Sequence, residues 1–306
     1  MKYASLKYGN TTNLGDQIQS FAAEQYLPAV DARFDRDSLA SASADVKHVL
    51  IMNGWFSHSP RECFPPSEAI VPVFVGFHIA DDAKTQAHFL SPSSIEYFKR
   101  YEPIGCRDIR TTEMLAERGV DAYCSKCLTL TFPPRAAGRI RDKVALVDAA
   151  GLPLPRFIRR GAVRLSHIVS GTCSDDTKRA MARRLLDFYR DEARLVITTR
   201  LHCALPCIAM RVPVVFFGNP RDYRLSILSD LNVPLYEYRT GGIVQRFTGW
   251  TLRGIPHVDW NPAPVLIEAE QLRLAANVRQ RLAERIGYPL RKDMPQAAGP
   301  REGQVQ

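Results

Sequence analysis

Residues 193–217 constrain the fold most, because they place one short helix between two runs of buried-strand character. Residues 193–198 (ARLVIT) are rich in β-branched and apolar side chains, which is typical of a buried parallel strand. Residues 201–210 (LHCALPCIAM) predict a helix, in which Pro206 is tolerated because it lies in the opening turns. Residues 212–217 (VPVVFF) predict a second buried strand. The order strand, helix, strand is typical of an α/β protein.

The same alternation runs through the rest of the chain. Further strands are expected at 2–8, 46–52, 71–78, 104–108, 127–132, 143–147 and 163–168. Further helices are expected at 14–26, 93–100, 111–118, 175–189 and 223–231. Because the alternation occurs in both halves, we predict two Rossmann-like α/β domains with parallel sheets and a cleft between them.

The domain boundary is expected at residues 133–138 (PPRAAG), where proline, glycine and small residues gather. This gives an N-terminal α/β domain at 1–135 and a C-terminal α/β domain at 140–262. A charged amphipathic helix within 263–290 is expected to pack back on the first domain. The tail at 291–306 is rich in proline, glycine, glutamine and charge, and is expected to be disordered.

Composition excludes several classes of protein. The 306 residues contain no run of eighteen apolar side chains and begin without a secretory signal, so we expect a cytoplasmic protein. Seven cysteines are an odd number without the spacing of a disulfide scaffold. Cys124 and Cys127 form one CxxC pair, which no second pair or nearby histidine completes, so no metal site is expected.

The chain carries a net charge of +9, from 41 basic and 32 acidic residues. This excess fits an anionic substrate, and it also fits peripheral contact with the cytoplasmic face of an acidic membrane. The arginines are scattered, without a basic stripe that alternates with stacking aromatic rings. We therefore expect no nucleic-acid partner.

Thr199-Arg200-Leu201-His202 lies where the strand at 193–198 turns into the following helix. Ligands of open α/β sheets bind at the carboxyl ends of the strands, and a helix N-terminus there favours anions. Arg200 and His202 are therefore expected to project into a ligand crevice. A histidine near a helix start is also typical of a surface or capping residue.

Two more motifs follow predicted strands: Asn13-Leu14-Gly15-Asp16 and Gly105-Cys106-Arg107-Asp108. In this order and spacing, the three motifs resemble those of the polysaccharide pyruvyl transferase family, and the similarity extends over about residues 2–231. One departure is Met52-Asn53-Gly54-Trp55, where many members carry a glycine-rich loop.

The resemblance implies a fold like that of the two-domain GT-B glycosyltransferases, with the donor held mainly by the C-terminal domain and the acceptor on the N-terminal side. It implies transfer of pyruvate from phosphoenolpyruvate to a saccharide, usually as a cyclic ketal, in cell-surface or exopolysaccharide biosynthesis. Phosphoenolpyruvate is the donor substrate, and no cofactor is implied. The acceptor can be lipid-linked, nucleotide-linked or polymeric.

The resemblance also implies roles for individual residues. Arg200 and Leu201 are expected to bind the donor, His202 to act as the general acid, and Arg107 to make a second anion contact. Asn13 and Asp16 either orient the acceptor or serve as a helix N-cap and a first-turn acid.

The chemistry of pyruvyl transfer requires the same types of residue. A donor with both a carboxylate and a phosphate suits the planar, bidentate guanidinium group. Protonation of its enol carbon requires an acid whose pKa lies near the working pH, and histidine is the usual choice.

Three further residues have two interpretations each. His78 either faces the cleft or is a satisfied structural histidine, and Arg221 and Arg224 either line the anion crevice or lie on the surface.

Two other functions are compatible with the sequence. One is a GT-B glycosyltransferase that uses a nucleotide-sugar, and the other is a non-catalytic sugar- or lipid-binding relative.

Overall fold

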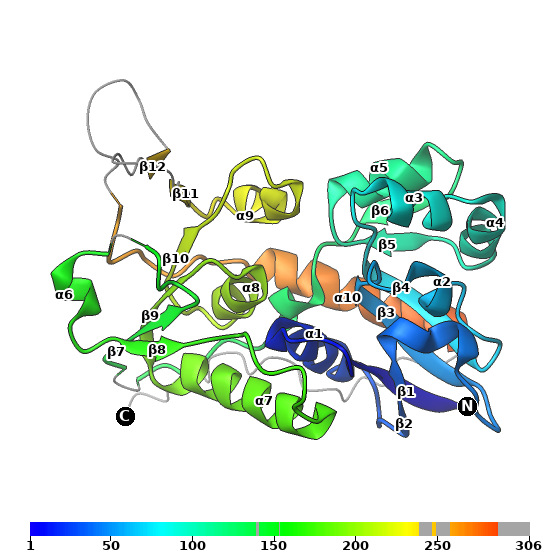
Figure 1. Ribbon diagram of the computed structural model, residues 1–306, viewed down its shortest axis with the longest axis horizontal. Helices are drawn as coiled ribbons and strands as arrows, with labels where there is room; N and C mark the ends of the chain where they lie inside the picture. Colours follow the sequence, from blue (N-terminus) through cyan, green and yellow to red (C-terminus); the bar gives the residue numbers. More distant parts are fainter. Residues whose placement is uncertain (139–140, 153, 239–246, 249–257, 287–306) are drawn as a thin grey trace, which may run out of the picture.

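A computed structural model describes residues 1–138, 141–152, 154–238, 247–248 and 258–286. Its described strands form two six-stranded sheets, one from each half of the chain (Figure 1). The predicted α/β class with two parallel sheets is therefore confirmed. The predicted tail at 291–306 lies outside the described residues, as do residues 287–290 of the predicted C-terminal segment.

The first sheet has the strand order β2-β1-β3-β4-β5-β6, and its strand pairs are parallel. Its strands are β1 (Lys2–Lys7), β2 (Ala32–Asp35), β3 (His48–Trp55), β4 (Ile70–His78), β5 (Ile104–Cys106) and β6 (Ala122–Cys124). The strand order reverses between β1 and β3, so loops from this point open a crevice at the carboxyl edge of the sheet.

The second sheet has the order β12-β11-β10-β9-β7-β8 and is parallel except for the β11–β12 pair. Its strands are β7 (Lys143–Val147), β8 (Val163–Leu165), β9 (Ala193–Thr198), β10 (Val214–Phe217), β11 (Leu235–Tyr238) and β12 (Phe247–Thr248). Here the order reverses between β7 and β9, which places a second crevice beside the loop that follows β9.

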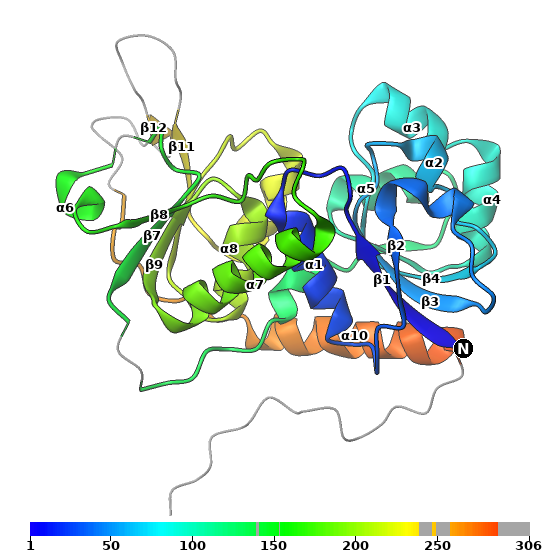
Figure 2. The ribbon, with the colours of Figure 1, turned by 60° about the horizontal axis from the view of Figure 1, so that its bottom comes forward.

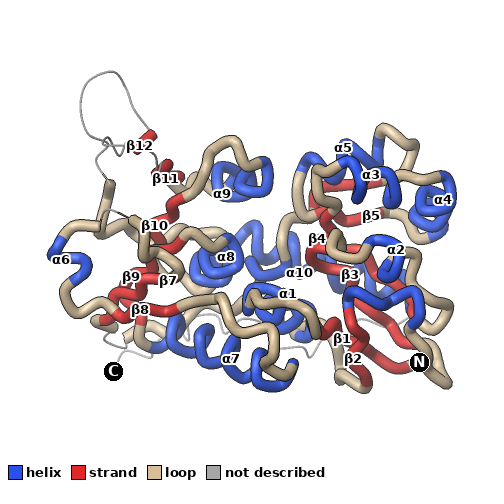
Figure 3. The backbone as a smooth tube through the Cα atoms, in the orientation of Figure 1, coloured by secondary structure: helices blue, strands red, loops and turns tan. Residues whose placement is uncertain are grey.

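The helices flank and connect the two sheets (Figure 3). The α-helices are α1 (Leu14–Glu24), α2 (Pro60–Cys63), α3 (Ala83–Phe89), α4 (Pro92–Arg100), α5 (Ile109–Ala116), α6 (Arg156–Arg159), α7 (Asp175–Asp191), α8 (Leu201–Ala209), α9 (Ser226–Asp230) and α10 (Glu268–Ile286). Short 3₁₀ helices are η1 (Arg36–Ser41), η2 (Leu128–Thr131) and η3 (Tyr223–Leu225).

Helix α1 lies between the two halves and is buried over most of its surface (Figure 2). Ile18 and Phe21 belong to the same hydrophobic cluster as Leu185 of α7 and Leu205 of α8. Because this cluster takes side chains from both halves, the two sheets share one core through α1, which fixes the start of α1 against the start of α8.

Helix α10 runs along both halves of the molecule (Figure 2). Asn277 accepts a hydrogen bond of 2.7 Å from the hydroxyl of Tyr123, and Arg285 donates one of 2.7 Å to the carbonyl of Tyr101. Gln271 donates to the carbonyls of Phe132 and Ala209. These contacts tie the last described helix to both halves of the chain.

The strand predicted at 127–132 is wrong. This buried apolar run forms the 3₁₀ helix η2, and the last strand of the first sheet is β6, a few residues earlier. Lys126 between them has a φ of 66°, which turns the chain out of extended conformation. Leu128 and Leu130 then pack into the core that α1 and α8 share. A short apolar run has the same pattern in either conformation.

In the described residues, no helix combines the length and the apolar character that crossing a membrane requires.

Candidate functional site

A pocket of about 350 Å³ lies at the carboxyl ends of strands from both sheets. It is lined by Asn13, Asp16, Trp55, Arg107, Leu152, His167, Thr199, Arg200, Leu201, His202, Phe217, Gly218, Asn219, Asp222, Arg224 and Leu225. All six residues predicted for the site are in this set, although they come from three separate motifs. The volume lies within the range of small-molecule sites.

Arg200 is the N-cap of α8, directly after β9. Its Nε donates a hydrogen bond of 2.8 Å to Asp148, which also accepts from the hydroxyl of Ser166 and the amide of His167. Burial alone would raise the pKa of Asp148, but these hydrogen bonds and the Arg200 cation lower it. Asp148 therefore acts as a fixed anion that orients the guanidinium at the pocket wall.

His202 lies in the first turn of α8 and is half-buried. Its Nε2 is buried and has no hydrogen-bond partner within the described parts of the chain. Burial lowers the pKa of His202 well below its ordinary value, and the positive charge of Arg107 and the nearby His167 add to the effect. In the protein without ligand, these effects therefore favour the neutral imidazole of His202 over the imidazolium.

Arg107 is a buried cation without an ion-pair partner among the described residues. It follows β5, only 5% of its surface is exposed, and its amide donates to the carbonyl of Phe77 at 2.7 Å. None of the carboxylates in the described regions lies within ion-pair distance of its guanidinium, and the adjacent Asp108 is paired with His78 instead. A buried unpaired charge is costly, so this side of the pocket is arranged to receive an anion.

Arg224 is already neutralised within the pocket. Its Nε and Nη2 donate to Asp222 at 2.9 and 2.6 Å, and its guanidinium lies 6.0 Å from the ring of Trp55. Arg224 thus lines the pocket, as one of its two interpretations predicted. Arg221 is not among the lining residues.

His167 is a lining residue that the sequence analysis missed. It is fully buried, its Nε2 lies 3.0 Å from the hydroxyl of Tyr189, and its Nδ1 has no partner among the described residues. Trp55 also lines the pocket, and no group in the described ranges forms a hydrogen bond with its buried Nε1. His167 follows β8, so the strand-end rule that found Arg200 applies to it as well. Predicting that strand to 168 placed His167 inside it.

His78 does not line the pocket. It is fully buried, its Nδ1 lies 2.6 Å from Asp108, and its ring stacks on Tyr223 at 5.9 Å. Burial and the charge of Arg107 lower the pKa of His78 to about 4 despite the carboxylate. This placement fits a structural histidine, but only one of its ring nitrogens is satisfied, since Nε2 is buried without a hydrogen-bond partner among the described residues.

The Asn13–Asp16 motif brings α1 against the start of α8. Asn13 is the N-cap of α1, and its Oδ1 accepts from the amide of Gly15 at 3.0 Å. A Cβ on Gly15 would lie 3.0 Å from the Cβ of His202 and 3.1 Å from Oδ1 of Asn13. The glycine therefore permits the close approach that sets the position of His202.

We expect Gly15→Ala to push the two helix starts apart, because the added methyl group meets both neighbours inside ordinary contact distance. The unfolding free energy should fall by about 1–3 kcal/mol, as for other overpacked sites, and turnover should fall with it. Thermal denaturation and a rate assay measure both effects. Gly171→Ala is the matched control, since its Cβ would meet only Thr12 at 3.8 Å. Equal effects of the two substitutions would contradict the role given to Gly15.

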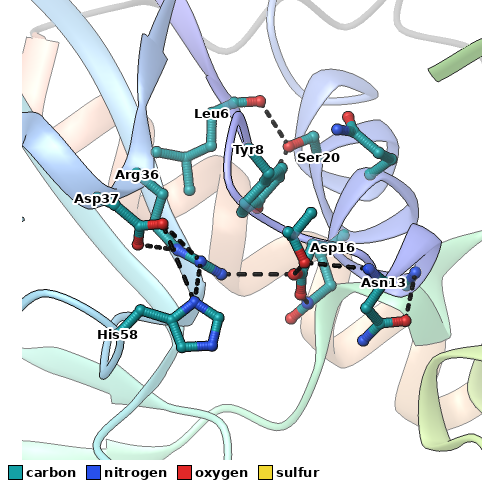
Figure 4. A network of polar contacts seen from close by, with 12 residues as sticks. Leu6, Tyr8, Asn13, Asp16, Ser20, Arg36, Asp37 and His58 are labelled. Carbon is teal, nitrogen blue, oxygen red and sulfur yellow. Dashed lines mark hydrogen bonds and ion pairs between the residues drawn. The ribbon is translucent and has the colours of Figure 1, made fainter. Parts of the chain in front are cut away.

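Asp16 belongs to a buried polar network in the first half (Figure 4). Its Oδ2 accepts from the hydroxyl of Thr11 at 2.7 Å and from Arg36 at 3.5 Å. The fully buried Arg36 also donates to Asp37 at 2.8 Å and to Nδ1 of His58 at 2.7 Å. Asp16 is therefore both a first-turn residue of α1 and a lining residue of the pocket. An acceptor-orienting role for it stays a prediction.

Across the described ranges, no group of three or more His, Cys, Asp or Glu side chains is arranged to hold a metal ion. Cys124 is half-buried, and Cys127 is buried beside Thr129.

Comparison with known proteins adds the family to this geometry. Residues 13–221 match the family model described as polysaccharide pyruvyl transferase. Among solved structures, the chain is similar to a functionally uncharacterized protein from Klebsiella pneumoniae subsp. pneumoniae. The two are 13% identical with a TM-score of 0.43, and the match covers 74% of this chain and 88% of the other. No curated protein matches.

The family match begins at the N-cap of α1, continues through Arg107, and includes the whole of α8 with Arg200 and His202. It spans more than half of the chain and every predicted site residue. The family supports a pyruvyl-transfer enzyme in polysaccharide biosynthesis. The protein belongs to the polysaccharide pyruvyl transferase family.

Proposed function

We propose that this protein transfers the pyruvyl group of phosphoenolpyruvate to a saccharide and closes it into a cyclic ketal across two hydroxyls. The observation that carries the proposal is Arg107, a buried guanidinium that forms no ion pair within the described part of the chain, in the same pocket as Arg200 and His202. A small donor with two anionic groups supplies the missing charge. The acceptor lies on the side of Asp16 and Asn13, and the two sheets act as the donor and acceptor halves of a GT-B-like arrangement.

In this reaction, Arg107 and Arg200 bind the carboxylate and phosphate of the donor, with Leu201 beside them. His202 gives a proton to C3, and the electrons of the C2–C3 double bond form the new C–H bond. The first acceptor hydroxyl bonds to C2 and loses its proton. The bond from C2 to the phosphate oxygen then breaks, and the second hydroxyl closes the ketal. The proton of the first hydroxyl returns to His202, and the proton of the second leaves with the phosphate. These steps need neither a metal nor an organic cofactor.

The low pKa of His202 opposes proton donation only in the protein without ligand. Burial, Arg107 and His167 disfavour the imidazolium there. A bound anionic donor offsets this positive charge, so the protonated form becomes favourable when it is needed.

We therefore expect donor binding to take up protons near neutral pH. The pKa of His202 rises on binding, so the affinity for phosphoenolpyruvate should increase as the pH falls from the pKa of the complex towards the lower pKa of the free protein. Calorimetry in buffers with different ionisation enthalpies measures the uptake, and His202→Gln should abolish it. Proton release, or uptake that is unchanged in His202→Gln, would exclude this linkage.

Two experiments test the function itself. Phosphoenolpyruvate should raise the melting temperature, whereas uridine and guanosine nucleotides should not. The reverse pattern would favour a nucleotide-sugar glycosyltransferase. Turnover is tested by measuring phosphate release with a panel of lipid-linked, nucleotide-linked and polymeric acceptors. Phosphate release that depends on one of these saccharides is the expected result. Donor binding without any phosphate release over the panel would favour a non-catalytic relative. The proposal includes a cytoplasmic location.

A further inference from the structure

The connection between β7 and β8 presents an aromatic ring to solvent among exposed arginines. Phe157 of α6 exposes 68% of its surface. Arg156, Arg159 and Arg160 beside it are exposed, as is Arg164 on β8. We call these five residues the α6 patch. Figures 1 and 2 both show α6 on the side of the second sheet that faces away from the first sheet.

The positive charge of the α6 patch is not neutralised by the described protein. None of its four arginines takes part in the ion pairs of the described residues, whereas Arg190, Arg211 and Arg273 elsewhere on the surface do. The sequence from 149 to 174 contains no aspartate or glutamate. The patch is therefore a local concentration of positive charge, whereas Arg190, Arg211 and Arg273 are each paired with a carboxylate.

The outward position of Phe157 is fixed by its neighbours. Leu154 and Ile158 are buried in a cluster with Val144 and Ile197 of the second sheet. Because Ile158 points into this core, the adjacent Phe157 must point away from it. Leu152, earlier in the same connection, lines the pocket. The α6 patch is thus anchored to the sheet and continuous in the chain with the pocket wall.

We propose that the α6 patch binds the surface of a membrane that contains anionic phospholipids. An aromatic ring inserts at the level of the headgroups, while guanidinium groups contact lipid phosphates and keep their charge in water. Nucleic acid would use the arginines but leave the single Phe157 without a role, since strand binding needs a series of stacking rings. This inference goes beyond the proposed reaction, because it concerns where the enzyme binds rather than what it transfers.

Co-sedimentation of the full chain with vesicles tests the inference. Binding should be measurable with vesicles that contain phosphatidylglycerol and much weaker with phosphatidylcholine alone. Each arginine near an anionic surface contributes about 1 kcal/mol, so Arg159→Glu/Arg160→Glu should weaken binding at least about tenfold. Phe157→Ser should also weaken it about tenfold, through the lost apolar contact. Added salt should reduce the binding of the wild type.

Arg33→Glu/Arg118→Glu is the matched control, because it makes the same change in net charge at two exposed arginines of the first half. This control should bind as the wild type does. If the two double substitutions weakened vesicle binding equally, net charge alone would explain the effect, and the assignment to the α6 patch would be overturned. Wild-type binding to both vesicle types alike, or to duplex DNA but not to vesicles, would overturn it too.

The same variants keep the two proposals separate. Stabilisation by phosphoenolpyruvate should be unchanged in Arg159→Glu/Arg160→Glu and in Phe157→Ser, since these residues do not line the pocket. That measurement also shows that the variants fold. If phosphoenolpyruvate failed to stabilise even the wild type, the proposed donor would be wrong while the vesicle result would still decide the membrane contact.

Discussion

Turnover of His202→Ala should be about 10²–10⁴-fold lower than that of the wild type, while binding of phosphoenolpyruvate largely survives. The expected loss is that of a general acid. His202 lines the pocket, and its buried Nε2 has no protein partner in the described chain. Arg107 and Arg200 remain to hold the anionic groups in the variant. Steady-state rates of phosphate release and calorimetric donor affinities measure the two effects separately.

The control for this substitution is His88→Ala. His88 is half-buried like His202, but its Nε2 contacts the carbonyl of Phe64 and it is not a lining residue. Its removal should leave the rate per folded molecule near that of the wild type. Near-normal turnover in His202→Ala would exclude the general-acid role. A large loss in both variants would point to destabilisation instead, which thermal denaturation would reveal.

The part of the site that was predictable from sequence depends on local pattern. The strand at 193–198 coincides with β9, and the following helix begins at Leu201 as expected. Because ligands bind at the carboxyl ends of parallel strands, finding the end of β9 was enough to place Arg200 and His202 in a pocket. The same rule, applied to the strands before Asn13 and Arg107, brought all three motifs together.

The part that was not predictable depends on tertiary packing. Nothing in the sequence of α1 indicates that it lies in a core shared by both halves, or that Gly15 meets His202. The short strand β2 (ARFD) lacks a clear strand pattern and was missed. The unpaired state of Arg107 is equally invisible, since Asp108 follows it in sequence and is paired with His78 only in the folded chain.

Arg107→Met should change stability and donor binding in opposite directions. In the protein without ligand, the substitution replaces a buried cation that has no ion pair with the described residues by an apolar side chain of similar volume, so the unfolding free energy should rise by about 1–4 kcal/mol. The affinity for phosphoenolpyruvate should fall by about 2–5 kcal/mol, because the donor loses a desolvated charged partner. This corresponds to a decrease of roughly 30- to 5,000-fold. Chemical denaturation and calorimetry provide the two numbers.

A higher unfolding free energy together with a lower donor affinity distinguishes an arginine that binds the ligand from one that stabilises the fold. An arginine that held the fold together would destabilise the protein on removal, as expected for one that satisfies a carboxylate, such as Arg36 between Asp16 and Asp37. Arg118→Met, at an exposed arginine outside the pocket, should change neither quantity appreciably. If Arg107→Met lowered stability and kept the donor affinity, the buried charge would have a protein partner, and the pocket would lose its main reason to bind an anion.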